Sequence, residues 1–284
     1  MRRDLSFSED QWWPSPLLAL TSMDSSSLRS FGDVVQPLGL GQNWPGLPEG
    51  KVMPPIERWN ISAPLRPLAG GFRNVVLRTV GLNRELVFKT TLRSEDAMVW
   101  VSEVQDVARG CGLVVPQMVQ STSGQFVEEG WVCEAFSDGA SAKAEDMTTM
   151  TPMMSAFHAR TSAVFQRPGF LSSTELLDSE RGGDVDLSGM PQQLVEICRA
   201  AWEAVVQTQE AVVHGDINVN NLLRCPDGRL VLLDWDECRF DKVLFDLAAL
   251  GEVSPAERRA ALAWEVACSW QIEPEHAQAL AARL

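Results

Sequence analysis

The chain has 284 residues, 45% of them hydrophobic, and a formal net charge of −14 at pH 7. This composition is typical of a folded globular protein, with material for one two-lobed unit or two modest domains. The acidic balance argues against nucleic acid as a partner, because phosphate backbones are bound by clustered lysine and arginine side chains.

No apolar run approaches the roughly 20 residues that a membrane helix needs, and Met1-Arg2-Arg3 is followed by a polar, acidic segment. We therefore expect a cytoplasmic protein with no membrane partner. The six cysteines form no C-x-x-C pair, so we expect them to be reduced and mostly buried, with neither zinc nor disulfides.

Residues 1–64 are dense in proline, serine, glycine and tryptophan, a composition that rarely forms long helices or strands. We interpret them as an N-terminal extension, either a structural addition or a lid or dimerisation arm. Trp12, Trp13 and Trp44 are expected to be at least partly buried against the rest of the chain or a second subunit, because exposed indoles in such number promote aggregation.

Residues 65–137 are expected to form a first lobe. The pair Gly70-Gly71 lies between β-prone segments, and the next predicted strand, residues 85–89, ends in Lys89. A glycine pair alone is usually a turn, and a strand lysine usually points to solvent. Both signals gain weight from the order in which the glycine pair, the strand that ends in Lys89 and the next predicted helix follow one another along the chain.

A helix is expected from Ser94 to Arg109. Ser94 is a typical N-cap, and two acidic residues follow in the first turn, where they complement the helix dipole. One apolar stripe along this helix is expected to be buried, and it consists of Met98, Val101, Val104 and Ala108. The strand predicted next, residues 131–136, completes the lobe.

Residues 138–284 are expected to form a second, mainly helical lobe. One helix carries Phe157 and His158, and we interpret His158 as a structural hydrogen-bonding residue. Another helix is expected over residues 193–209.

The most informative segment is residues 213–221, which read VHGDINVNN, followed by LLDWD at residues 232–236. Between them, the Asp-Gly pair at residues 227–228 is the strongest hairpin signal in the chain. A hairpin there brings Asn221 and Asp234 to the same end of a two-stranded ribbon.

These two segments resemble the catalytic loop and metal-binding strand of the aminoglycoside phosphotransferase and choline kinase superfamily, which phosphorylates small-molecule hydroxyls and has a fold like that of protein kinases. The resemblance implies an α+β, bilobal protein-kinase-like fold, with an antiparallel sheet and one helix in the N-terminal lobe and a mainly helical C-terminal lobe. It implies that Asp216 is catalytic, accepting the hydroxyl proton or orienting that hydroxyl, and that Asn221 and Asp234 bind Mg2+. Gly215 replaces an arginine that in many protein kinases receives a phosphorylated activation loop, which implies a constitutively assembled site.

The same resemblance implies how the first lobe binds a nucleotide. Gly70 and Gly71 let the backbone approach the phosphates, and Lys89 neutralises the α- and β-phosphates. A carboxylate on the following helix holds this lysine. Glu103 is at the most plausible distance along the chain, and Glu95 is the alternative.

The strand at residues 131–136 resembles the strand that becomes the hinge between the lobes, which implies that backbone groups of Glu134 and Phe136 hydrogen-bond the adenine of ATP. After the metal-binding strand, Asp246-Leu247-Ala248 matches the end of the family's G-D-P-x-x-D-L-A motif, whose glycine and proline are missing here. Asp246 is expected to brace the catalytic loop through that loop's backbone N–H groups.

We therefore expect an ATP- and Mg2+-dependent transferase that phosphorylates a hydroxyl group of a small molecule. Aminoglycosides, amino alcohols, sugars and amino acids all remain open as acceptors. Asp236 is either a ligand of metal or of a cationic acceptor, or an exposed carboxylate. The alternative function is a kinase-like protein that binds a nucleotide or partner without transfer. A protein kinase is disfavoured, because no A-P-E sequence follows Asp234.

Overall fold

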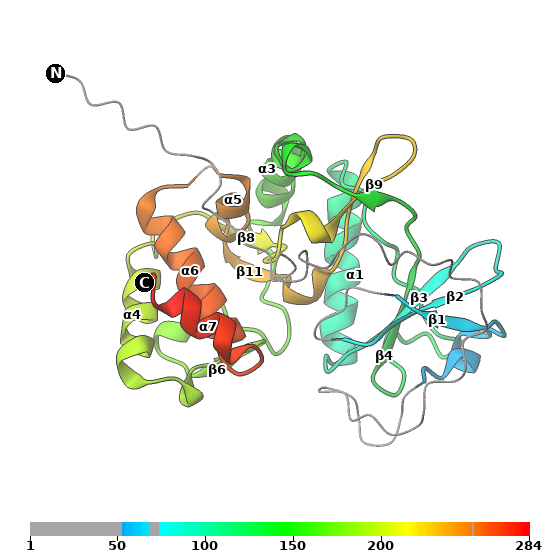
Figure 1. Cartoon of the computed structure of the whole chain (residues 1–284), viewed down its shortest axis with the longest axis horizontal. Coiled ribbons are helices and arrows are strands. Elements are labelled where there is room, and N and C mark those ends of the chain that lie inside the picture. The colour runs from blue at the N-terminus through cyan, green and yellow to red at the C-terminus, as the bar shows by residue number, and fades with distance from the viewer. Residues whose placement is uncertain (1–52, 69–73, 252) are drawn as a thin grey trace, which may run out of the picture. The chain divides into compact units, whose positions relative to one another are not determined.

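The computed structural model describes residues 53–68, 74–251 and 253–284, all within the unit Trp44–Leu284 (Figure 1). The pair Gly70-Gly71 and the three tryptophans of the N-terminal extension lie outside the described residues, so the roles expected for them stay predictions. Within the described ranges, no helix is both long and apolar enough to cross a membrane.

The N-terminal lobe is built on a four-stranded antiparallel sheet with the strand order β1-β2-β3-β4. In the register of the last two strands, Lys89 lies opposite Val132 and Val87 lies opposite Glu134. Because side chains alternate between the two faces along a strand, these four side chains share one face of the sheet. The strands are β1 (Leu65–Pro67), β2 (Val76–Thr79), β3 (Leu86–Thr90) and β4 (Trp131–Ala135).

The opposite face of this sheet buries a separate apolar cluster. Trp59 ends a short 3-10 helix (Ile56–Trp59) and meets the Phe88 ring edge to face, with 5.3 Å between ring centroids. Such an aromatic pair stabilises by about 0.5–1.5 kcal/mol beyond its buried area. The other buried members of the cluster are Leu77, Leu86, Trp131 and Cys133. With its apolar face covered in this way, the sheet presents the polar side chains of Lys89 and Glu134 on its other face.

Helix α1 (Glu95–Gly110) packs on that other face. Its N-terminus is fixed by Ser94, whose side chain accepts the N–H of Ala97 at 3.2 Å. The predicted stripe is buried together with Val132 of the sheet, and comprises Met98, Val101, Val104 and Ala108. The helix and its buried side, predicted from the sequence, are therefore confirmed.

The C-terminal lobe is mainly helical. Helices α4, α6 and α7 pack together, with the rings of Trp202 and Trp264 in contact at a centroid distance of 6.0 Å. The helix predicted up to residue 209 ends at Glu203, shortly before Val205 and Val206, two β-branched residues of low helix propensity. The helices are α2 (Ala144–Met147), α3 (Thr151–Thr161), α4 (Gln192–Glu203), α5 (Leu244–Leu250), α6 (Pro255–Ser269) and α7 (Pro274–Ala281).

Short strands connect these helices and flank the catalytic block, the name used for the two segments, residues 213–221 and 232–236, that resemble the family's catalytic loop and metal-binding strand. Strands β9 and β10 form the hairpin predicted from the Asp-Gly pair, and Gly228 in its turn has a φ of +85°. Strand β8 leads into the predicted catalytic loop, residues 214–221, and pairs with β11. The strands are β5 (Ala140–Ser141), β6 (Arg181–Gly182), β7 (Val185–Asp186), β8 (Glu210–Val213), β9 (Leu222–Arg224), β10 (Leu230–Leu232) and β11 (Arg239–Lys242).

Candidate active site

Asp246, in the first turn of α5, holds the catalytic loop in place. Its carboxylate accepts the backbone N–H groups of His214 and Gly215, each at 2.9 Å, and lies 2.8 Å from Nε2 of His158. Burial raises the pKa of Asp246, but the bond to His158 and the bonds from the loop outweigh burial, so the pKa is lowered overall. The bracing role predicted for Asp246 and the structural role predicted for His158 are both confirmed.

Gly215 turns the chain sharply after β8. Its φ is +87°, and a Cβ at this position would come within 2.6 Å of Nη1 of Arg239 and 2.8 Å of the carbonyl oxygen of Glu237. Arg239 is itself buried, forms an ion pair with Asp241 at 2.9 Å and lies over the ring of Trp264. The space beside the loop is therefore filled by an arginine from β11, and glycine fits where any other residue would clash.

The carboxylate of Asp216 is held on both of its oxygens. Nδ2 of Asn218 donates to Oδ1 and Nδ2 of Asn221 donates to Oδ2, each at 2.7 Å. Burial raises the pKa of Asp216, and the positive charge that His214 can carry and the bond from Asn218 offset this only in part. A fixed carboxylate with a raised pKa is better suited to accept a proton near neutral pH.

Asn221 and Asp234 come together through the β9–β10 hairpin. Leu222 lies opposite Leu232, and the N–H of Leu233 donates to the carbonyl oxygen of Asn221 at 2.8 Å. The two residues therefore lie at the same end of this ribbon, as predicted. Asp234 adopts a left-handed conformation, with a φ of +58°, which is uncommon outside glycine and concentrates at functional sites.

Trp235 anchors the turn that follows. Its buried ring packs edge to face with Phe157 and His214, and its N–H donates to the carbonyl oxygen of Leu232 at 3.1 Å. The acidic residues on either side of Trp235, Asp234 and Asp236, line a pocket together with residues of β3, β4 and α1. Asp236 lines that pocket and its Oδ2 accepts a hydrogen bond from Asn74 at 2.8 Å. The reading of Asp236 as an exposed carboxylate is therefore wrong, and the acid-apolar-acid alternation of Asp-Trp-Asp was the signal for its position.

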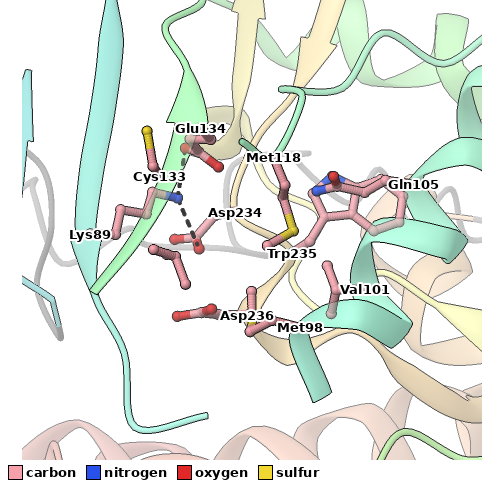
Figure 2. Close-up of a pocket in the computed structure, with 11 residues that line it drawn as sticks. Lys89, Met98, Val101, Gln105, Met118, Cys133, Glu134, Asp234, Trp235 and Asp236 are labelled. Carbon is pink, nitrogen blue, oxygen red and sulfur yellow. Dashed lines mark ion pairs between the residues drawn. The ribbon is translucent and has the colours of Figure 1, made fainter. Parts of the chain in front are cut away.

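Figure 2 shows Lys89 between two carboxylates. Its Nζ lies 3.2 Å from Oε1 of Glu134 and 3.6 Å from Oδ1 of Asp234. Burial by itself would lower the pKa of Lys89, but the charges of Asp234 and Glu134 outweigh burial and raise the pKa. The lysine is thus a stable cation beside the strand end that carries Asp234.

The partner predicted for Lys89 is wrong. Glu103 is exposed on α1. Glu95 accepts the backbone N–H groups of Phe126 and Val127 at 2.8–3.0 Å. The lysine is paired with Glu134, whose side chain shares a face of the sheet with it. The β3–β4 register, which the sequence pattern alone did not fix, explains the difference.

The backbone of Glu134 and the N–H group of Phe136 are engaged within the sheet. The N–H of Phe136 donates to the carbonyl oxygen of Glu85 at 2.9 Å, and Glu134 lies in β4 opposite Val87. The Phe136 ring lies under the guanidinium of Arg78, 3.6 Å from the ring centroid. The N–H of Phe136 is therefore not available to an adenine in this arrangement.

Two arginines behind the Asp-Trp-Asp turn are missing from the sequence predictions. Arg167 is buried, and its Nη1 donates to the carbonyl oxygen of Asp236 at 2.8 Å. Arg93 forms an ion pair with Asp184 at 2.7 Å, and both guanidinium groups lie over the ring of Phe170. Their partners lie 69 and 91 positions away along the chain, so no local pattern marks them.

Asn221 and Asp234 are suited to hold Mg2+. In proteins Mg2+ usually takes one or two carboxylates together with water and substrate phosphates, so a closed cage of side chains is not required. The side-chain nitrogen of Asn221 donates to Asp216. No N–H or O–H group of the described residues donates to the side-chain oxygen Oδ1 of Asn221. The side chain of Asp234 is 43% exposed. Both residues thus present an oxygen that a cation bound to phosphates can reach.

The solved structures that share this fold with the chain include three kinases of small molecules. The microcompartment-associated aminopropanol kinase has a TM-score of 0.53 and 15% identity, covering 80% of this chain and 91% of the kinase. Choline kinase LicA from Streptococcus pneumoniae has a TM-score of 0.53 and 13% identity, covering 79% and 95%. A thermostable mutant of the aminoglycoside phosphotransferase APH(4)-Ia, in a ternary complex with ADP and hygromycin B, has a TM-score of 0.54 and 13% identity, covering 80% and 93%. The predicted kinase-like fold, with its antiparallel N-terminal sheet and mainly helical C-terminal part, is confirmed.

Residues 64–280 match the model of the phosphotransferase enzyme family. The chain belongs to this family, which confirms the relationship inferred from the catalytic block. A search of curated proteins gives no match.

Proposed function

We propose that this protein transfers the γ-phosphoryl group of ATP, in the presence of Mg2+, to a hydroxyl group of a small molecule. The observation that carries the proposal is the grouping of Asp216, Asn221, Asp234 and Lys89. Asp216 bonds Asn221, Asn221 is joined through the hairpin to the residue before Asp234, and Asp234 pairs with Lys89. Together they supply a proton acceptor, two metal-binding oxygens and a phosphate-binding cation.

In this reaction Asp216 orients the acceptor hydroxyl and accepts its proton as the oxygen bonds to phosphorus. The bond from phosphorus to the β,γ-bridging oxygen breaks, and ADP leaves. Lys89 binds the α- and β-phosphates, while Asn221 and Asp234 hold Mg2+. When bound, Mg2+ offsets the charge of the phosphate oxygens. Fixed positioning and electrostatic stabilisation supply most of the rate in such transfers.

The first experiment determines which class of small molecule accepts the phosphoryl group. The fold neighbours carry the names of an aminopropanol kinase, a choline kinase and an aminoglycoside phosphotransferase, so amino alcohols and aminoglycosides lead the panel, followed by sugars and amino acids. The full chain is incubated with Mg-ATP and each compound. Acceptor-dependent ADP formation is measured together with the mass increase of one phosphoryl group on the acceptor.

An acceptor that gains a phosphoryl group with the wild type, and not with Asp216→Asn, supports the proposal. Binding of Mg-ATP without transfer to any member of a broad panel contradicts it. That second result favours the alternative of a nucleotide-binding protein without transferase activity.

A further inference from the structure

The side of α1 that faces the pocket carries no carboxylate. Met98, Val101 and Gln105 line the pocket from this helix (Figure 2). Gln105 is 2% exposed, and no described residue donates a hydrogen bond to its Oε1. A neutral amide therefore stands on the helix face from which an ion pair to Lys89 was expected.

The four acidic residues of α1 are all directed elsewhere. Asp96 and Glu103 are exposed, and Asp106 bonds Nη2 of Arg109. Glu95 accepts hydrogen bonds from backbone N–H groups of the loop before β4. None of them is in contact with Lys89.

Glu134 reaches Lys89 from within the same sheet. The two side chains project from neighbouring strands on one face, are each 16% exposed, and approach to 3.2 Å. Ion pairs this well shielded from water are much less screened than surface pairs. Because both residues lie in the ordered β3–β4 ladder, their separation is fixed by backbone hydrogen bonds and does not depend on the position of α1.

We propose that Glu134 is the positioning residue of Lys89, acting from strand β4 in place of a carboxylate on α1. The inference rests on the proposed function, since it concerns how the lysine meets nucleotide phosphates. Glu134 draws the ammonium group toward the sheet and away from Asp234, which lies on its other side at 3.6 Å. Asp234 is thereby left accessible to Mg2+.

Removing the charge of Glu134 leaves Asp234 as the nearest carboxylate to Lys89. The lysine then moves toward Asp234 and competes with Mg2+ for its oxygens. Glu134→Gln is therefore expected to weaken Mg-nucleotide binding and to raise the Mg2+ concentration needed for half-maximal activity. Substituting a residue that orients the ligands of a metal site commonly lowers metal affinity or activity by about 10–100-fold.

The experiment compares three single variants of the full chain. Glu134→Gln removes the charge at nearly constant volume, Glu134→Asp keeps the charge on a shorter side chain, and Glu103→Gln makes the same chemical change on α1. Calorimetry gives the Kd for Mg-ATP, kinetics gives kcat and KM for ATP and for Mg2+, and thermal melting reports folding. A double variant, Lys89→Gln/Glu134→Gln, removes both charges and guards against misfolding caused by an unpaired buried lysine.

We expect Glu134→Gln to raise the Kd for Mg-ATP by at least about tenfold, Glu134→Asp to fall between it and the wild type, and Glu103→Gln to stay within about twofold. In the Lys89→Gln background, adding Glu134→Gln is expected to change the Kd by less than about twofold, because Glu134 acts through the lysine. Equal affinity of Glu134→Gln and wild type overturns the inference. So does a loss in Glu103→Gln as large as that in Glu134→Gln, or a further large loss in the double variant.

Failure of the proposed function is a separate result. A wild type that binds Mg-ATP but phosphorylates no acceptor contradicts the function, while the pattern of Kd values among the variants still decides the role of Glu134. A wild type that transfers phosphate while Glu134→Gln matches it in every constant contradicts the inference alone. Absence of nucleotide binding in the wild type refutes both.

Discussion

Gly215→Ala tests whether the catalytic loop is held as tightly as its surroundings indicate. The substitution keeps the backbone N–H that donates to Asp246, so the brace itself is not removed. It adds one methyl group at a φ of +87°, in a space bounded by Nη1 of Arg239 at 2.6 Å and the carbonyl oxygen of Glu237 at 2.8 Å. Neither neighbour can yield easily. The arginine is pinned by its ion pair with Asp241, and the carbonyl belongs to the backbone.

The expected cost has two parts. Placing alanine in the left-handed region costs about 1–2 kcal/mol. Forcing a methyl group into a filled space costs a further 1–3 kcal/mol or so, the usual range for overpacking. The free energy of unfolding is therefore expected to fall by about 2–5 kcal/mol in total.

Gly228→Ala is the matched control. Gly228 has nearly the same φ, +85°, but a Cβ there meets no atom within 4 Å. It therefore carries the backbone cost alone, and the difference between the two variants isolates the clash with Arg239 and Glu237. Urea denaturation should place Gly215→Ala about 1–3 kcal/mol below the control, which for a domain of this size is roughly 2–12 °C in Tm. Equal stability of the two variants would refute the tight packing of the loop against β11.

Three further predictions concern the carboxylates. Asp216→Asn should lower kcat about 100-fold or more while the Kd for Mg-ATP stays within about twofold, because it removes a proton acceptor and no phosphate ligand; wild-type turnover would contradict that role. Asp234→Ala should raise the Kd for Mg-ATP at least about tenfold by calorimetry, and an unchanged Kd would contradict the metal assignment. Asp246→Asn should cost about 1–3 kcal/mol near pH 7, because one N–H of the loop loses its acceptor. Because folding lowers the pKa of Asp246, its carboxylate stabilises the folded state at pH values above the usual aspartate pKa range. This stabilisation is lost as the pH falls through and below that range. Urea melts of wild type and Asp246→Asn should therefore converge in acid, and a gap that is constant with pH would contradict the contribution of this carboxylate.

Features that depend on neighbours along the chain could be predicted from the sequence. The Asp-Gly pair fixed the β9–β10 hairpin, and the hairpin alone brings Asn221 next to the strand end that carries Asp234. Ser94 and the apolar stripe after it fixed α1 in the same way. In each case a turn or helix of known geometry converts spacing into position.

The partner of Lys89 could not be predicted in this way. Spacing along α1 offers several acids, and which face of the helix meets the pocket depends on packing against Val132 and the main core. The true partner, Glu134, is 45 positions from the lysine, and it becomes a neighbour through the register of two strands that a loop, α1 and another loop separate. A shift of that register by one residue would turn Glu134 to the other face of the sheet.

The buried Arg167 is a second residue whose role the pattern of charges along the sequence does not predict. Burial lowers the pKa of Arg167 to about 10, which is still well above neutral pH, so the side chain stays charged. Its Nη1 is satisfied by the carbonyl oxygens of Asp236 and Cys238, and not by a carboxylate. A guanidinium that binds carbonyls fixes the shape of the turn without occupying the oxygens of Asp234 and Asp236. Both acids consequently line the pocket, where their charge would be available to the Mg2+ that the proposed function requires.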